Sequence, residues 1–415
     1  MRKLAFIFSL VLIFVIPWEG VIDIPGIGAA GSATLARVMG LGLAAFWLAM
    51  VVYTGNFRKP GLFHLIFLIF VLWNGLSVFW SANPKRSFSH TFTWIQLLLL
   101  SFILWDLFRT KKDLLAGLQV YVLGAYVAVG SAILNFFSGK QFYTHYDRYS
   151  AGDTNPDGFG FILALGIPLA WYLASTLDEN KLSRLLKFVN YFYIPAALFG
   201  LALSGTRTAL AASILGVLYG LVSLSRLRIT TRIAIVFLLI SVSLILLPNV
   251  QSLKSFQRFN TISAEITQGD LNSRTEIWQE GLDSFNEHPI LGVGSNMYRS
   301  INSFGKVAHN SFISVLVELG LVGLVLFGII LAITFVQAWE LPKWDSIFWL
   351  TVLLVWTIGA STLSWEYRKS TWLFLTFLVA FGSLSPQRDQ VTSGNKVDIT
   401  GAREQKGMIV KDSSW

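Results

Sequence analysis

The sequence contains no cysteine and few charged residues. Without cysteine, thiol catalysis, disulfide bridges and thiolate-ligated zinc are all excluded. Charged residues make up 13% of the 415 residues, about half the ~25% usual in soluble domains. Hydrophobic residues reach 54%, and so few charges could not cover that much apolar surface on a soluble fold. The composition therefore predicts a membrane protein.

Apolar runs of roughly the 20 residues that a membrane-spanning helix needs recur along the chain. We expect about twelve of them, at residues 4–18, 35–53, 62–80, 90–108, 115–137, 158–175, 187–203, 208–224, 231–248, 310–337, 344–364 and 370–386. The first run follows a basic start, as in a signal peptide, but no small-residue cleavage site comes after it. We therefore expect a retained first helix and an all-α polytopic membrane protein.

The basic residues predict the orientation of these spans. Of the 32 Lys and Arg residues, 19 fall on the side of the two termini and 13 on the other side. Because basic loops stay in the cytoplasm, both termini are expected to be cytoplasmic. The formal net charge of +9 is scattered through short loops, so it indicates topology and an anionic lipid rather than nucleic acid.

One outward connection, residues 249–308, is unusually long for a compact protein. A capping box at Ser273 and Glu276 predicts a helix that begins near Arg274 and ends at His288-Pro289. Trp278, Leu282 and Phe285 follow a helical period, which favours an amphipathic helix on the membrane face. The expected organisation is nine transmembrane helices in residues 1–248, a periplasmic loop in 249–308, three transmembrane helices in 309–386 and a disordered cytoplasmic tail in 387–415.

Several arginines oppose the topology rule. Arg148, Arg207 and Arg274 all fall in the predicted outward connections. Guanidinium groups there are well suited to bind an anionic ligand, because they stay protonated and form paired hydrogen bonds to phosphate.

The most specific segment runs from His309 to Gly323. It places His309 and Asn310 at the start of a span, followed by nine residues and then Gly320-x-x-Gly323. This pattern resembles the signature of O-antigen ligases and related oligosaccharyltransferases. Three further stretches resemble the same superfamily, which includes the Wzy-type polymerases: SGTRTAL around Arg207, SRTEIW…HPILGVGSNMY in the long loop, and RYSAGDTNPDG from Arg148. The last departs from the commoner N-P-N pattern at Asp157.

The resemblance implies a membrane-embedded, GT-C-like glycosyltransferase. Such enzymes take a glycan from undecaprenyl pyrophosphate and join it to a hydroxyl acceptor, such as lipid A-core, at the periplasmic face of the bacterial inner membrane. It implies partners limited to the lipid-linked donor, the glycan acceptor and membrane lipids, with no nucleic acid. No cofactor and no metal are expected, since arginines can supply the positive charge.

The resemblance also implies roles for individual residues. Arg207 and Arg274 would stabilise the pyrophosphate leaving group. His309 is predicted to be either the general base for the acceptor hydroxyl or a positioning residue. Arg148, Asn310 and Glu318 are candidate substrate contacts. Arg148 could instead form an ion pair within the protein, and Glu318 could have a structural partner.

Two other functions stay open at this point. A Wzy-type polymerase would use the same donor chemistry with a different acceptor. A transporter of lipid-linked glycans would show internal repeats and broken helices at the midplane, whereas the polar residues here gather in one outward loop.

Overall fold

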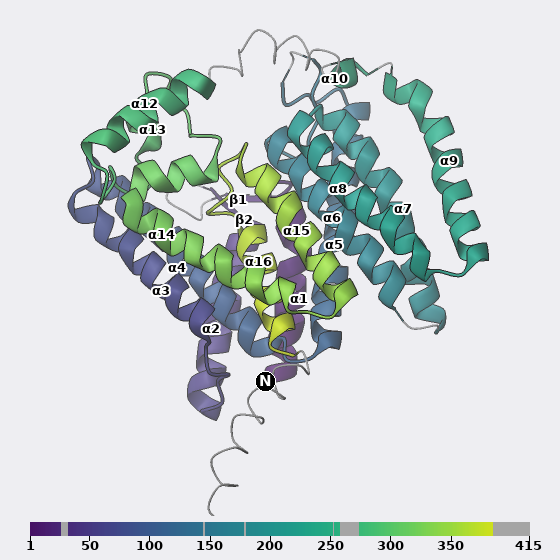
Figure 1. Ribbon diagram of the computed structural model, residues 1–415, viewed down its shortest axis with the longest axis horizontal. Coiled ribbons are helices and arrows are strands. Elements are labelled where there is room, and N and C mark those ends of the chain that lie inside the picture. Colours follow the sequence, from purple (N-terminus) through teal and green to yellow (C-terminus); the bar gives the residue numbers. More distant parts are fainter. Residues whose placement is uncertain (26–31, 144–145, 178–179, 252, 258–273, 385–415) are drawn as a thin grey trace, which may run out of the picture.

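A computed structural model describes residues 1–25, 32–143, 146–177, 180–251, 253–257 and 274–384 (Figure 1). The predicted cap at Ser273 and the predicted tail 387–415 lie outside these residues. The α-helices are α1 (Arg2–Val15), α2 (Leu35–Thr54), α3 (Leu62–Leu76), α4 (Pro84–Leu107), α5 (Lys111–Phe137), α6 (Pro156–Thr176), α7 (Lys181–Ser204), α8 (Arg207–Ser223), α9 (Ile229–Gln251), α10 (Lys254–Gln257), α12 (Arg274–Glu287), α13 (Tyr298–Ile301), α14 (Ser311–Trp339), α15 (Lys343–Ala360) and α16 (Lys369–Gly382).

Short elements complete the chain. Turns of 3₁₀-helix follow α1, α3 and α8, at η1 (Ile16–Trp18), η2 (Ser77–Phe79) and η3 (Leu224–Arg226). Strands β1 (Asp23–Pro25) and β2 (Ser32–Thr34) pair in antiparallel fashion between α1 and α2. Over the described residues the fold is therefore helical, with this small ribbon as its β-structure.

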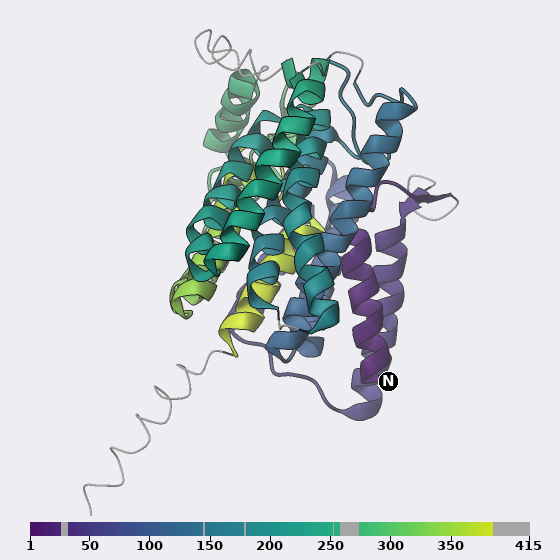
Figure 2. The ribbon, with the colours of Figure 1, turned by 90° about the vertical axis from the view of Figure 1, so that its right-hand side faces the viewer.

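The long helices run up and down between two ends of a bundle (Figure 2). At the end where α1 starts and α16 stops, the terminal end, Asp106 of α4 pairs with Arg2 and Arg109. Arg58, between α2 and α3, donates to Ser383 Oγ there at 2.7 Å. At the opposite end, here called the far end, Lys369 pairs with Glu19. The alternation follows the one predicted from the sequence.

Each of the predicted spans coincides with a helix. Within the described residues, eight helices are long and apolar enough to cross a membrane. These are α2, α3 with η2, α4, α5, α6, α7, α8 with η3, and α14. The helices α1, α9, α15 and α16 fall outside that set, and α16 is a shorter apolar helix of 14 residues. The chain is thus a polytopic, helical membrane protein.

Helix α6 lies inside the bundle with α5, α7, α8 and α15 packed around it (Figure 1). Of its apolar window, 83% is buried, as expected for a helix that is hydrophobic all round. A Cβ at Gly166 would lie 2.2 Å from Tyr193 Oη, so glycine allows α7 to pack closely. This packing fixes the position of α6, whose first turn at the far end contains Pro156 and Asp157.

Helix α14 is broken at Gly320, where φ is 67° and ψ is −168°. The connection between α12 and α13 fills the break with its backbone. Val293 N donates to Val317 O at 3.0 Å, Gly294 N donates to Glu318 O at 2.9 Å, and Leu321 N donates to Pro289 O at 2.9 Å. Inside a membrane protein such backbone groups must be satisfied internally. The spaced glycine of the sequence motif is therefore the point at which the outward loop docks.

Gly320→Ala should destabilise the protein, because alanine is strained at this left-handed φ and its Cβ would lie 2.1 Å from Ile290 O. We expect a loss of about 2 kcal/mol or more, seen as a lower midpoint in thermal unfolding of the detergent-solubilised protein. Gly328→Ala, in the same helix with open space around it, is the control and should leave the midpoint unchanged or raise it. Equal midpoints for the two variants would contradict the docking role.

Candidate active site

The turn between α7 and α8 places Arg207 at the far end. Gly205 adopts a left-handed conformation with φ 60° and ends α7, which is the usual role of glycine after a helix. A Cβ at this position would lie 2.8 Å from Ser255 O of α10. Thr206 is extended, and α8 begins with Arg207. The tight turn therefore fixes the start of α8 against α10.

Arg148, predicted to contact substrate or to form an ion pair, is held by protein groups. Its guanidinium donates to Asp157 Oδ1 at 2.6 Å, to Ser204 O at 2.7 Å and to Thr206 Oγ1 at 3.2 Å. Arg148 is only 5% exposed. Thr206 Oγ1 in turn donates to Pro156 O at 2.9 Å. Arg148 thus ties the ends of α6, α7 and α8 into one cluster and holds the carboxylate of Asp157 in place.

Arg274 is the first residue of α12. Burial lowers its pKa, and the carboxylate of Asp157 opposes that shift. The charge of Asp157 therefore acts on Arg274, although the two residues are more than a hundred positions apart in the sequence.

The apolar stripe of α12 packs on protein, which corrects the predicted position on the membrane face. Trp278 Nε1 donates to Ala308 O at 2.7 Å. Trp278 and Phe285 pack on a small buried cluster that includes Tyr298 and Val317. The stripe therefore docks α12 beside the start of α14 instead of anchoring it to lipid.

His309 lies in the bend before α14, with a left-handed φ of 50°. Its pKa is lowered to about 4, first by burial and then by the positive charge of Arg274, while Asp157 acts in the opposite direction. The imidazole is therefore neutral at neutral pH. Within the described part of the chain its ring has no hydrogen-bond partner. His309, Arg274 and Asp157 thus share one electrostatic environment, next to the turn that carries Arg207.

Asn310 and Glu318, the other predicted substrate contacts, have partners within the protein. Asn310 Oδ1 caps α14 and accepts from Phe312 N at 2.9 Å and from Ile313 N at 3.1 Å. The carboxylate of Glu318 accepts from Asn296 N at 2.7 Å and from Tyr298 N at 3.1 Å. Glu318 thereby holds the start of α13 against the broken part of α14.

Sequence reasoning gave three residues too little weight. Asp157 was considered only as a departure from the N-P-N pattern, and Thr206 was not among the predicted site residues. Glu366, between α15 and α16, is 3% exposed, and among the described residues its Oε2 has no hydrogen-bond partner. Burial raises the pKa of Glu366 to about 7. The available signal for it was a lone acid in the short segment STLSWEY, between two apolar spans.

The cluster at the far end is rich in cations and poor in metal ligands. Across the described ranges, no group of three or more His, Asp or Glu side chains is placed to hold a metal ion. Positive charge at this site comes from Arg148, Arg207 and Arg274. Such a cluster suits an anionic ligand with several phosphate oxygens.

A known protein family and a known protein are similar to this chain. Residues 192–328 match the O-antigen ligase family, a range that contains Arg207, Arg274 and His309 but not Arg148 or Asp157. The chain is also similar to the exopolysaccharide production protein ExoQ of Rhizobium meliloti (strain 1021), with 24% identity over 341 residues. That similarity covers 74% of this chain and 72% of ExoQ. Residues 192–328 are therefore similar to the O-antigen ligase family, and about three quarters of the chain is similar to a protein of exopolysaccharide production.

Proposed function

We propose that the protein is an O-antigen ligase. It transfers a glycan from undecaprenyl pyrophosphate to a hydroxyl of lipid A-core at the periplasmic face of the bacterial inner membrane. The observation that carries this proposal is the convergence of His309, Arg274 and Asp157 beside the Arg207 turn. The match of residues 192–328 to the O-antigen ligase family supports it.

The reaction breaks the bond between the sugar C1 atom and the pyrophosphate oxygen. Negative charge grows on the leaving pyrophosphate, and the guanidinium groups of Arg207 and Arg274 stabilise it through paired hydrogen bonds. The acceptor hydroxyl attacks C1 and gives its proton to the neutral imidazole of His309. In this scheme Arg148 positions Asp157 and the α7–α8 turn. Asn310 holds the start of α14, and Glu318 holds the docked loop. A substrate contact by either residue would use side-chain atoms that these hydrogen bonds do not occupy.

The low pKa of His309 fits this scheme once substrate is considered. In the free protein the ring is neutral, because burial and Arg274 disfavour the imidazolium. A bound pyrophosphate brings negative charge beside the ring, which favours the protonated form and raises the pKa. The donor would therefore strengthen the base that the reaction needs.

We also propose that the far end faces the periplasm and that the chain crosses the membrane about twelve times, with residues 249–308 outside. The 19-to-13 division of Lys and Arg favours a cytoplasmic terminal end. Reporter fusions at the C-terminus and after Gly305 should report opposite sides of the membrane. Both reporters on one side would disprove this topology.

A Wzy-type polymerase is the second candidate, favoured by the similarity to a protein of exopolysaccharide production. It would use the same arginines and the same base, with a lipid-linked repeat unit as acceptor in place of lipid A-core. A transporter is disfavoured by the sealed break in α14, because the backbone of residues 289–294 occupies the gap.

Arg207→Lys and Arg274→Lys should each lower the transfer rate about a hundredfold, on the order of 3 kcal/mol. Lysine keeps the charge but loses the planar fork that binds two phosphate oxygens. The measurement is glycan transfer in vitro with purified undecaprenyl-linked donor. Arg86→Lys, at the far end in α4, is the control and should transfer at the wild-type rate. Wild-type rates in both test variants would exclude the paired contact.

His309→Gln should be nearly as inactive as His309→Ala, because glutamine can donate a hydrogen bond but cannot accept the proton. In the wild type, kcat/KM should fall as the pH drops through about 4, the pKa of the free protein. The acid limb of kcat should lie at higher pH, since the bound donor raises the pKa. His288→Gln, an exposed histidine of the same loop, is the control. Substantial activity in His309→Gln would leave His309 with a positioning role only.

A further inference from the structure

A cavity lies between α1, α2, α4 and the start of α16. Its volume is about 290 Å³, near the lower end of the range for small-molecule sites, which is roughly 300–1,000 Å³. Its walls are mostly apolar and include Leu12, Leu41, Leu97, Leu100 and Ile103. Helices α8, α12 and α14, which carry the candidate active site, do not line it. We call this cavity the α2 groove.

The α2 groove is charged at one end only. Glu19, Arg37, Arg368 and Lys369 line it at the far end, whereas Leu100 and Ile103 lie well down α4, which starts at that end. Lys369 is paired with Glu19. No described carboxylate lies within ion-pair distance of Arg37 or Arg368, so three cations face one acid. The groove therefore has the shape and charge of a site for a lipid with an anionic head and an apolar chain.

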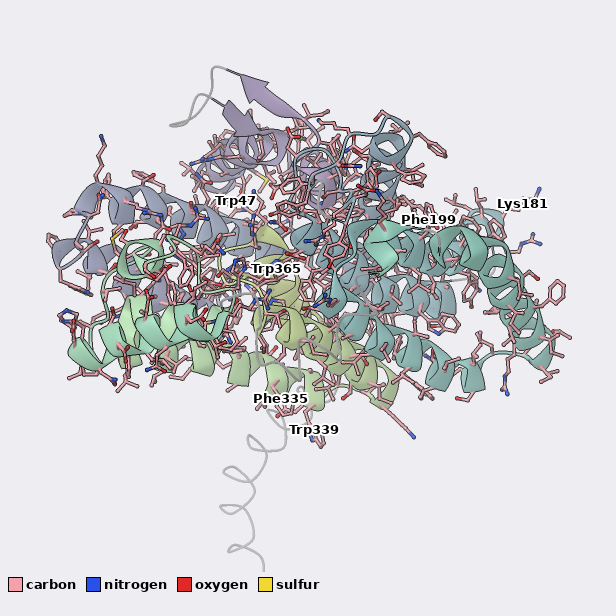
Figure 3. All side chains as sticks on the ribbon, turned by 90° about the horizontal axis from the view of Figure 1, so that it is seen from above. Trp47, Lys181, Phe199, Phe335, Trp339 and Trp365 are labelled. Carbon is pink, nitrogen blue, oxygen red and sulfur yellow. The ribbon has the colours of Figure 1, made fainter. Side chains whose placement is uncertain are left out.

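The connection between α15 and α16 forms a wall between the α2 groove and the candidate active site. Trp365 N donates a hydrogen bond to Ser311 Oγ of α14 at 2.8 Å, and Ser311 lies two residues after His309. The Trp365 ring also meets Phe161 of α6, with ring centroids 4.4 Å apart. Three residues further on, Arg368 lines the groove. Viewed from above, Trp365 lies near the middle of the bundle (Figure 3).

We propose that the α2 groove binds the phosphorylated, acylated lipid anchor of the glycan acceptor. This inference rests on the proposed function, in which the donor pyrophosphate occupies the separate cluster of Arg207 and Arg274. A phosphate held by Arg37 and Arg368 would direct the sugars of that lipid across the wall toward His309, the group that takes the acceptor proton. The protein then holds two lipids at once, one on each side of the α15–α16 connection.

Two glycines of α2 give a matched test. Gly40 lines the groove, and a Cβ there would meet only Leu12, at 3.9 Å, so Gly40→Leu fills the space without a backbone clash. Gly42 has nothing within 4 Å and does not line the groove, so Gly42→Leu is the control. Gly40→Leu should weaken binding of purified lipid A to the protein in nanodiscs by about tenfold or more. Binding of undecaprenyl pyrophosphate should stay unchanged, and Gly42→Leu should match the wild type.

The charged end is tested by Arg37→Gln combined with Arg368→Gln. This double variant should raise the KM for lipid A-core about tenfold or more, with the KM for donor and kcat unchanged. Lys85→Gln, an exposed cation at the start of α4, is the control. The inference is overturned if Gly40→Leu and Gly42→Leu bind lipid A equally well. It is also overturned if Gly40→Leu weakens binding of the donor instead of binding of lipid A. The proposed function fails separately, if the wild-type protein does not transfer glycan to lipid A-core at all.

Discussion

The break in α14 at Gly320 is the feature on which the far end depends. A helix inside a bilayer cannot leave backbone groups unpaired, so an interruption needs partners from elsewhere in the protein. Residues 289–294 supply them through Val293, Gly294 and the carbonyl of Pro289. Gly292 fits because a Cβ there would lie 2.5 Å from Glu318 O. This backbone docking fixes α12 and α13 against α14, and it brings Arg274 close to His309.

Electrostatics at the site follow from the position of Asp157 among several cations. Asp157 accepts from Arg148 and Thr206 and also acts on Arg274 and His309. With the positive charges in excess, the neutral form of His309 is favoured until an anion binds. The protein thereby couples the arrival of a negatively charged donor to the basicity of the group that activates the acceptor.

The sequence predicted the helices, their alternation and the end of α12 before His288-Pro289, because apolar runs and helix-ending residues are local signals. It identified His309 and Gly320 through the spacing of one motif. It could not show that Trp278 packs on Ala308 instead of on lipid, since an apolar stripe fits both surfaces. Arg148 and Asp157 pair across a loop, and Glu366 is buried between two spans. Such contacts arise only when segments distant in sequence pack together.

The most direct test of the central claim is the lipopolysaccharide of a strain in which the gene is deleted, separated on a gel. The account predicts lipid A-core without attached polymer, and polymer that accumulates on undecaprenyl pyrophosphate. Restoring the wild-type gene should return polymer to the core, whereas the His309→Ala gene should not. Core that carries a single repeat unit in the deletion strain would contradict ligation and assign the protein to polymerisation.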